Sequence, residues 1–361
     1  MRVLVMWANE GTTNLGVRAL ARGSSDLLRQ VWKDADITFA NYGERPPELP
    51  WGRPRSLVRE RMTRRLGMMD WFRQFDLVWD TRSGDSFADI YGIQRHMTMS
   101  LVHEFAVQAG VPVVLAPQTI GPFNASFGRV VARRSLHRSA LVFARDAMSA
   151  TASARLGRPV DGVSSDLVFA IEQPAAGVRR DVLLNVSGLL WRDNPHVDSA
   201  MYRSAVRRIV TGLLSDGREV TLFPHVLDSA HHDNDLPACM ELADEHAGGV
   251  DVFSPSDLDD ARAAIGAAEL IIGARMHACL NALSVATPAV AMAYSRKFAP
   301  LMKSVGWPHV VSLMETVDAE HVAEQVLSAT RANHLKERAV EARAEGNRML
   351  APVTDRLEEL T

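Results

Sequence analysis

The segment Glu269–Ala278 reads ELIIGARMHA, and it decides the fold that the sequence predicts. Its apolar run lacks polar alternation and ends at Gly273, which is typical of a strand buried on both faces of a parallel sheet. Arg275 and His277 then fall in the first turn of a predicted helix, where backbone N–H groups favour a bound anion. The segment predicts an anion site at the carboxyl edge of the sheet. In the alternative reading, Arg275 pairs with a carboxylate and His277 packs at the domain surface.

The same alternation of apolar runs and amphipathic stretches extends along most of the chain, which predicts parallel sheets with right-handed crossovers. The predicted strands are Arg2–Met6, Ile37–Ala40, Leu77–Trp79, Val111–Ala116, Leu141–Ala144, Val182–Val186, Glu219–Phe223, Val250–Phe253, Leu270–Ile272, Ala289–Ala293 and Val310–Ser312. The predicted helices are Leu15–Val31, Gln94–Ala109, Phe127–His137, Ala147–Leu156, Asp198–Leu214, Leu236–Glu245, Leu258–Ala267, Met276–Ser284, Phe298–Val305 and Ala319–Ala329.

The periodic pattern breaks once, at the Pro/Gly/Ala-rich stretch Glu172–Gly177. A chain of 361 residues is long enough for about two domains. We therefore predict α/β domains at residues 1–174 and 175–361. The tail Arg331–Thr361 reads as helix and is expected to cross back onto the first domain. Ligands of such domains bind beyond the carboxyl ends of the strands, which makes the crevice between the domains the expected site.

Composition excludes several classes of protein. The formal net charge of −3 gives no support to a nucleic-acid partner. Cys239 and Cys279 cannot form a disulfide framework, and they fit a reducing compartment. No apolar run is long enough for a signal peptide or a membrane span, so we expect a cytoplasmic protein. The dinucleotide, P-loop, serine-hydrolase and zincin motifs are all missing from the sequence.

Further candidate residues follow other predicted strands. Lys297 follows Ala289–Ala293 and is expected near His277, because consecutive strand–helix turns lie on one edge of a parallel sheet. Arg145 ends another strand and is expected to face the crevice; a surface contact with Asp146 is its alternative. Gln118 and Gly121 lie in a stiff loop after a strand, where the amide offers both a donor and an acceptor. For Lys297 the alternative is a solvated side chain, and for the loop a structural turn.

Two groups of residues have weaker signals. His225 directly follows a predicted strand and is expected to line the crevice, whereas His231 and His232 lack the fixed spacing of metal ligands. No metal site is predicted. The stretch Arg53–Arg73 contains seven arginines. It reads as a solvated helix face, with guidance of an acidic or pyrophosphate-bearing acceptor as the alternative.

Together, these motifs resemble the polysaccharide pyruvyl transferase family. The strongest match is IIGARMHA at 271–278, followed by TPAV at 287–290 and YSRK at 294–297. Further matches are QTIGPF at 118–123, ARD at 144–146 with Ser149, and SD at 165–166. They occur in the family's order over most of the chain. The loop Asn9–Gly16 departs from the family pattern, since Asn14 and the glycines are present but the acidic residue of N-x-G-D is not.

The resemblance implies two Rossmann-like parallel-sheet domains in the arrangement of GT-B glycosyltransferases. It also implies transfer of a pyruvyl group from phosphoenolpyruvate to two sugar hydroxyls, giving a ketal and phosphate, with no cofactor and no metal. The implied catalytic residues are His277, Arg145 and Lys297. The expected substrate-binding residues are Arg275, Gln118, Gly121, Asn14 and His225.

The expected partners are phosphoenolpyruvate and a sugar or glycan-precursor acceptor; the reading also allows a homo-oligomer and a peripheral contact with a lipid-linked acceptor. A near-neutral imidazole suits proton delivery to the donor, which makes His277 the expected general acid. Two alternatives stay open at this point. One is a GT-B glycosyltransferase that uses a nucleotide sugar, and the other is a non-catalytic protein that binds a sugar or an anion.

Overall fold

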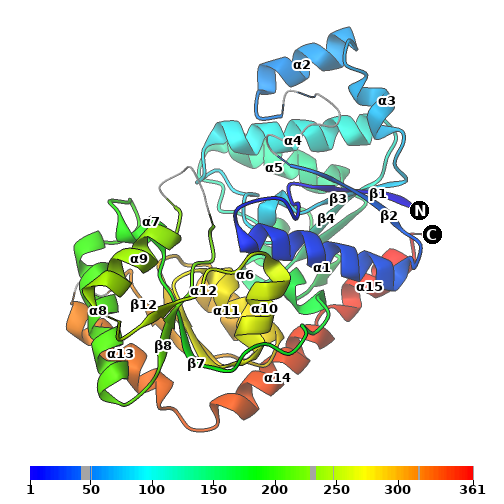
Figure 1. The fold of residues 1–361 in the computed structure, drawn as a ribbon. Helices are drawn as coiled ribbons and strands as arrows, with labels where there is room; N and C mark the ends of the chain where they lie inside the picture. Colours follow the sequence, from blue (N-terminus) through cyan, green and yellow to red (C-terminus); the bar gives the residue numbers. More distant parts are fainter. Residues whose placement is uncertain (42–48, 50, 228–232, 247, 316–317, 361) are drawn as a thin grey trace. The chain divides into compact units, whose positions relative to one another are not determined.

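The computed structural model describes residues 1–41, 49, 51–227, 233–246, 248–315 and 318–360. The chain forms two compact units, whose elements are labelled in Figure 1. Unit 1 consists of Met1–Glu10, Leu20–Ala170 and Asn347–Thr361, and unit 2 of Gly11–Ala19 and Ile171–Gly346.

The two units differ from a linear division at residue 174, because the boundary falls between Ala170 and Ile171 and two other segments are exchanged. The segment Gly11–Ala19 belongs to unit 2, because Asn14 and Val226 form an antiparallel bridge there. The end of the chain belongs to unit 1, where Pro352 lies against Gly162. Both exchanges depend on contacts between residues far apart in the sequence.

Unit 1 contains a six-stranded parallel sheet with the order β2-β1-β3-β4-β5-β6. Its inner strands are apolar and buried, as expected for a sheet covered on both faces. The strands are β1 (Arg2–Met6), β2 (Asp36–Ala40), β3 (Leu77–Asp80), β4 (Val113–Gln118), β5 (Leu141–Ala144) and β6 (Gly162–Val163). The point at which the strand order reverses lies between β1 and β3, and this is where open α/β sheets bind ligands.

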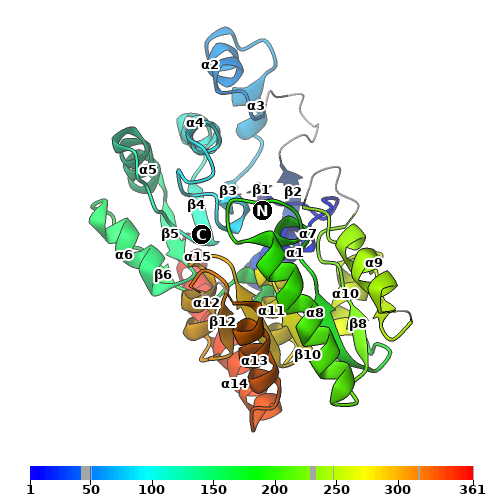
Figure 2. The same ribbon diagram turned by 90° about the vertical axis from the view of Figure 1, so that its left-hand side faces the viewer.

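Helices cover both faces of the unit 1 sheet; α4 and α5 lie on one face and α1 on the other (Figure 1). The helix α2 packs on the outer side of α4 (Figure 2). The helices are α1 (Leu15–Val31), α2 (Pro54–Thr63), α3 (Met68–Phe72), α4 (Ile93–Gln108), α5 (Ser126–Arg138), α6 (Ala147–Arg155) and α15 (Ala351–Glu358), with 3-10 turns η1 (Arg82–Gly84) and η2 (Leu167–Ala170).

Unit 2 contains a second six-stranded parallel sheet, with the order β12-β11-β10-β7-β8-β9. The order reverses between β7 and β10, which pair so that Asn185 lies beside Gly273. The strands are β7 (Arg180–Asn185), β8 (Val220–Leu222), β9 (Asp251–Val252), β10 (Ala268–Gly273), β11 (Ala289–Ala293) and β12 (Val310–Ser312). The predicted ligand edge of unit 2 therefore lies beyond Asn185 and Gly273.

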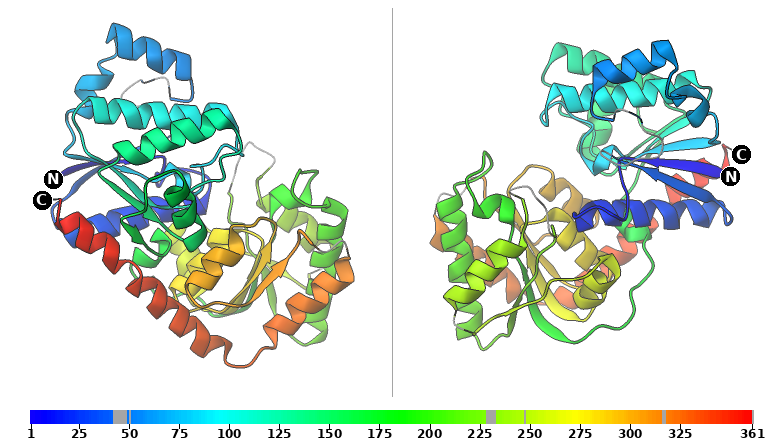
Figure 3. Two further views of the ribbon diagram at one scale, coloured as in Figure 1. Left: turned by 180° about the vertical axis from the view of Figure 1, so that it is seen from behind. Right: turned by 45° about the horizontal axis from the view of Figure 1, so that its top comes forward.

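The helices of unit 2 again form two layers, with α8 packed on α13 over one face of the sheet and α10 packed on α11 over the other (Figure 3). These helices are α7 (Gly188–Trp191), α8 (Ser199–Ser215), α9 (Leu236–Glu245), α10 (Leu258–Gly266), α11 (Met276–Ser284), α12 (Phe298–Ser304) and α13 (Ala319–Thr330), followed by α14 (Leu335–Arg348), which leads into unit 1. None of the described helices is long and apolar enough to cross a membrane.

The predicted α/β class with two Rossmann-like sheets is confirmed. The strands Arg2–Met6, Leu141–Ala144, Ala289–Ala293 and Val310–Ser312 have the predicted bounds. Val111–Ala116 is wrong at its start, because β4 begins only at Val113, after Pro112. Proline has no N–H to donate to a neighbouring strand, so the strand begins after it.

Candidate functional site

The carboxyl end of β10 places two of the predicted residues at the strand reversal of unit 2. The backbone of Arg275 is extended (φ −95°, ψ 122°), and α11 begins directly after it. His277 therefore lies in the first turn of α11 and is half-buried. The Arg275 side chain is 11% exposed. The site thus has a guanidinium and a half-buried imidazole, whose Nε2 atom is buried, beside a helix N-terminus, which favours an anion.

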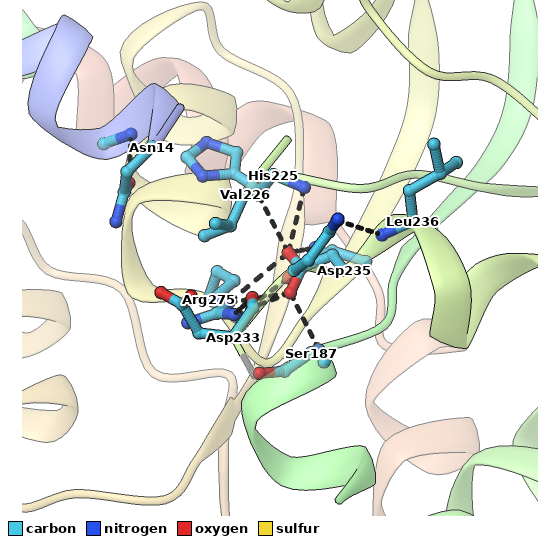
Figure 4. A network of polar contacts seen from close by, with 12 residues as sticks. Asn14, Ser187, His225, Val226, Asp233, Asp235, Leu236 and Arg275 are labelled. Atoms are coloured by element: carbon cyan, nitrogen blue, oxygen red, sulfur yellow. Dashed lines mark hydrogen bonds and ion pairs between the residues drawn. The ribbon is translucent and has the colours of Figure 1, made fainter. Parts of the chain in front are cut away.

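The Arg275 side chain is held by Asp235, a fully buried carboxylate at the centre of the network in Figure 4. Arg275 donates from Nε (3.1 Å) and from Nη2 (2.7 Å) to Asp235 Oδ1. Although burial opposes its charge, the charge and hydrogen bonds of Asp235 raise the pKa of the Arg275 guanidinium. Arg275 is therefore a fixed cation, and the alternative of a paired arginine is confirmed for this side chain.

Asp235 also organises the loops on either side of Arg275. Its Oδ2 accepts the backbone N–H groups of His225 and Val226, both at 3.0 Å, and its Oδ1 accepts that of Gly188 at 2.8 Å. Asn185, at the end of β7, accepts the N–H of Arg275 at 2.9 Å. The ends of β7, β8 and β10 are thus joined by side chains with fixed positions.

His225, whose backbone N–H donates to Asp235, is almost completely buried. Burial, together with the positive charges of His277 and Arg275, holds the pKa of His225 well below its ordinary value. Asn281 of α11 connects the two histidines, because its Nδ2 donates to the His277 carbonyl at 2.8 Å and lies 3.5 Å from His225 Nε2. A neutral His225 can accept a hydrogen bond from Asn281 Nδ2. His225 therefore helps to position α11 and contributes no charge to the site.

The first turn of α1 lies against the His277 ring. Asn14 Oδ1 accepts the N–H of Gly16 at 2.9 Å, which caps this helix, and the N–H of Leu15 donates to the His225 carbonyl at 3.1 Å. A Cβ atom added at Gly16 would lie only 2.8 Å from His277 Nδ1. Two helix N-termini therefore meet beside the imidazole. The structure shows Asn14 as a helix cap, and its predicted substrate contact stays a prediction.

Lys297 lies at the carboxyl end of β11, the strand beside β10, immediately before α12. The residue is half-buried. Burial and the charge of Lys297 lower the pKa of His196, whose ring centroid is 5.4 Å from that of Tyr294. Lys297 is thus on the predicted edge of the sheet, beside His196.

The other predicted residues gather in unit 1. Arg145 is fully buried, and donates from Nη1 to Asp166 (2.5 Å) and from Nε to Thr119 (3.0 Å). The alternative contact with Asp146 is wrong, since Asp146 caps α6 through the Ser149 N–H at 2.8 Å. Asp146 is held by the first turn of its own helix, whereas Asp166 comes shortly after β6, the strand beside β5, and so can pair with Arg145.

Gln118 and Gly121 belong to the same edge of unit 1. Gln118 is buried, and its side-chain Nε2 donates to the backbone carbonyl of Asp80 at 3.3 Å. The backbone carbonyl of Gln118 accepts the N–H of Arg145 at 3.2 Å. Gly121 has a left-handed backbone (φ +78°), which a side chain would strain. The eight predicted site residues thus form two groups, with Arg145, Gln118 and Gly121 in unit 1 and the other five in unit 2.

Sequence reasoning missed four residues that build the unit 2 site. Asn185 and Asp235 carry signals that could have been used: a polar residue ends an apolar strand in the first case, and an aspartate precedes Leu-Pro at a helix start in the second. Gly16 and Asn281 have no such signal, because their importance depends on what lies beside them in space.

No group of three His, Cys, Asp or Glu side chains that could hold a metal occurs in the part of the chain that the structure describes. His231 and His232 lie outside the described residues. Both cysteines are buried and unpaired, and burial raises the pKa of the Cys279 thiol to about 12.

Comparison with solved structures defines the class of fold. The UDP-GlcNAc 2-epimerase from Neisseria meningitidis bound to UDP-GlcNAc has a TM-score of 0.60 at 10% identity, with all of both chains covered. The UDP-GlcNAc 2-epimerase from Methanocaldococcus jannaschii has a TM-score of 0.57 at 13% identity, with 98% of this chain and 100% of that chain covered. At such low identity these likenesses show the fold alone, which is GT-B-like.

The family follows from the sequence itself. The family model of the polysaccharide pyruvyl transferases matches residues 14–296, and the chain belongs to this family. The amylovoran biosynthesis protein AmsJ from Erwinia amylovora is 23% identical over 275 residues, which cover 69% of this chain. The matched region spans 64% of that relative's length. The predicted family is confirmed.

Proposed function

We propose that the protein transfers the pyruvyl group of phosphoenolpyruvate to two hydroxyl groups of a sugar in a glycan or glycan precursor. The products are a cyclic pyruvate ketal and inorganic phosphate. The observation that carries this proposal is the pairing of a fixed arginine with a half-buried histidine at the strand reversal of unit 2, in a chain of the pyruvyl transferase family. No cofactor and no metal enters the proposed reaction.

The charges of the site suit this donor. Phosphoenolpyruvate has a carboxylate and a phosphate, and Arg275 and Lys297 lie at the ends of the adjacent strands β10 and β11. Arg275 already donates from Nε and Nη2 to Asp235, so it contributes a fixed positive charge, whereas Lys297 contributes a compact point charge. The N-terminal turn of α11 adds the positive end of a helix at His277. The first N–H groups of α1 are already used, since Leu15 donates to the His225 carbonyl and Gly16 to Asn14 Oδ1. We infer that this edge of unit 2 binds the donor.

His277 is proposed to act as the general acid. It donates a proton to the methylene carbon, which becomes the methyl group, and leaves a cationic centre at the carbon that bears the phosphate. One sugar hydroxyl attacks this carbon and loses its proton, which restores the acid. Phosphate then leaves, and a second hydroxyl attacks the same carbon and loses its proton to the departing phosphate. The reaction thus balances: of the two hydroxyl protons, one replaces the proton that the acid gave to the methylene carbon, and the other leaves with the phosphate.

The predicted roles of Arg145 and of Gln118, Gly121, Asn14 and His225 toward substrates stay predictions. His225 and Asn14 have clear supporting contacts in unit 2, through Asn281 and Gly16. Because phosphoenolpyruvate is a metabolite of the cytoplasm, we propose that the reaction takes place there.

The test is a donor assay with an extracted pool of glycans and glycan precursors as acceptors. The purified protein is incubated with phosphoenolpyruvate in one series and with nucleotide sugars in another. We expect inorganic phosphate and a pyruvylated product in the first series only. Release of a nucleoside diphosphate would instead identify a glycosyltransferase, and ligand binding without turnover in either series would identify a binding protein.

The His277→Gln variant tests the role of the imidazole in the same assay. Loss of a general acid lowers the rate by roughly 10² to 10⁴. Because His277 is half-buried, we expect the melting temperature to change little. The matched control is His196→Gln, since His196 is a second histidine near Lys297. Turnover of His277→Gln at the wild-type rate would contradict the assignment.

A further inference from the structure

The segment Arg53–Leu66 of unit 1 has a charge pattern that the proposed reaction does not use. It contains six arginines and one acidic residue, Glu60, although the whole chain is slightly acidic. Residues 54–63 form α2, which ends at Arg64 in a left-handed conformation (φ 54°). None of the ion pairs among the described residues includes Arg55, Arg59 or Arg65.

Few residues of α2 contact the rest of unit 1, and they lie on the inner face of the helix. Leu57 and Glu60 are buried, and Arg61 donates to Gln108 of α4 at 2.9 Å. The Glu60 carboxylate accepts the backbone N–H groups of Leu66 at 2.9 Å and Met68 at 3.3 Å. The only carboxylate of the segment is therefore turned inward, where it fixes the turn after α2.

The outer face combines exposed aliphatic side chains with arginines. Met62 is 79% exposed, Leu66 49% and Val58 41%. Arg55 and Arg59 are exposed on the same helix. Figure 2 shows α2 as the outermost helix of its layer in unit 1, beyond α4. We call the exposed side chains of Arg55, Val58, Arg59, Met62, Arg65 and Leu66 the α2 surface.

We propose that the α2 surface binds the anionic face of a phospholipid bilayer. Arginine side chains bind lipid phosphates, and the aliphatic side chains enter the headgroup region, which is the general behaviour of a basic amphipathic helix. A polyanion such as nucleic acid would need the arginines but would leave the aliphatic side chains in water. The helix has 10 residues, too few to span a bilayer, so the contact is peripheral.

The first test is co-sedimentation of the full-length protein with vesicles of phosphatidylcholine, with or without phosphatidylglycerol. We expect binding to the anionic vesicles only, decreasing as salt is added. Arg55→Gln with Arg59→Gln removes two charges, each of which contributes about fivefold to binding near an anionic surface. Arg29→Gln is the control, because Arg29 is an exposed arginine in the last turn of α1.

The second test separates a bilayer from other polyanions. Val58→Ser with Met62→Ser keeps every arginine, and we expect it to lower vesicle binding by roughly tenfold or more. Met240→Ser on α9 is the control, since Met240 is 47% exposed. Unchanged vesicle binding by the Val58 and Met62 variant, or equal binding of soluble heparin and anionic vesicles, would overturn the proposal. Melting curves confirm that each variant is folded.

The third test reports insertion directly. Both native cysteines are buried, so Met62→Cys supplies an exposed thiol for an environment-sensitive fluorophore. We expect a blue shift of its emission on anionic vesicles, and no shift for the same label at Met240→Cys. A label at position 62 that stays in a fully aqueous environment on bound protein would overturn the proposal. All three tests are independent of the reaction that the protein catalyses.

Discussion

The carboxyl edges of the two sheets both hold arginines paired with buried aspartates, but these arginines differ in exposure. In unit 1, Arg82 and Arg145 are fully buried, and each is paired with an aspartate, Asp80 at 2.9 Å and Asp166 at 2.5 Å. In unit 2, Arg275 keeps 11% of its side chain exposed. His277, beside it, is half-buried. Arginines are paired with aspartates at both edges, but only in unit 2 does the paired arginine keep part of its side chain exposed beside a half-buried histidine.

The position within each sheet explains part of this difference. Arg275 and His277 follow β10, at the reversal of strand order in unit 2. Arg145 follows β5, which is separated by β4 from β3 and so lies away from the reversal between β1 and β3. Ligands of open α/β sheets bind at the reversal. Position alone does not decide the matter, because Arg82 follows β3 at the reversal of unit 1 and is nevertheless fully buried against Asp80. A strand-end arginine is a better candidate for chemistry when it lies at the reversal and also keeps part of its side chain exposed.

The largest predicted effect on stability belongs to unit 1. Arg145→Ala leaves the buried Asp166 carboxylate without its cation, which costs about 3–5 kcal/mol in the free energy of unfolding. Urea denaturation measures this cost. His277→Gln is the comparison variant, with a change of less than about 1 kcal/mol. A loss below about 1 kcal/mol for Arg145→Ala would show that the ion pair does not hold this edge together.

The next prediction concerns the contact between α1 and His277. Gly16→Ala places a Cβ 2.8 Å from His277 Nδ1, so the ring has to move. A misplacement of about 1 Å lowers turnover by roughly 10²-fold, and the crowding costs about 1–3 kcal/mol of stability. Gly266→Ala is the matched control, since its nearest neighbour, Pro174 Cγ, is at 3.4 Å. Equal turnover of the two variants would contradict the proposed position of the imidazole.

The smallest predicted effect is a change of the free energy of unfolding with pH, which comes from buried neutral histidines in both units. Burial and the charge of Arg82 lower the pKa of His96 to about 4, and burial holds that of His225 well below its ordinary value of 6.5. Below pH 6.5 the unfolded chain binds protons that the folded chain does not, so stability falls with falling pH. The slope is about 1.4 kcal/mol per pH unit for each histidine, and for His96 it continues to about pH 4.

This pH dependence is measured by urea denaturation between pH 5 and pH 8. His96→Gln and His225→Gln should each reduce the slope below pH 6.5. An unchanged slope in His225→Gln would show that His225 binds a proton equally well in the folded and unfolded chain, against the buried position that supports His277.

Most of the fold could be predicted from the sequence because its strands are continuous apolar runs. The turn from β10 to α11 was predicted closely, since Gly273 separates a buried strand from an amphipathic helix. The bounds of α2 could not be predicted from the sequence, because this helix buries only Leu57 and Glu60. A charged helix with so narrow a buried face has no periodic signal to detect.

The site could be predicted only where its residues are local in sequence. Arg275 and His277 are two positions apart, so the motif contains both. Asp235 joins the turn at Arg275 to the loop at His225 and to Gly188, over separations of 10 to 47 residues. Arg145 pairs with Asp166, 21 positions on, although Asp146 is adjacent. Such partners depend on how the strands are ordered in the sheet, and residue types alone do not determine that order.

The most direct test of the central claim is a transfer reaction in D₂O, followed by mass spectrometry and NMR of the product methyl group. A general acid that protonates the methylene carbon of phosphoenolpyruvate delivers one solvent-derived hydrogen. We predict a ketal methyl with one deuterium, formed by the wild-type protein and lost in His277→Gln. A product that carries a sugar from a nucleotide donor, or a ketal methyl without deuterium, would contradict the account.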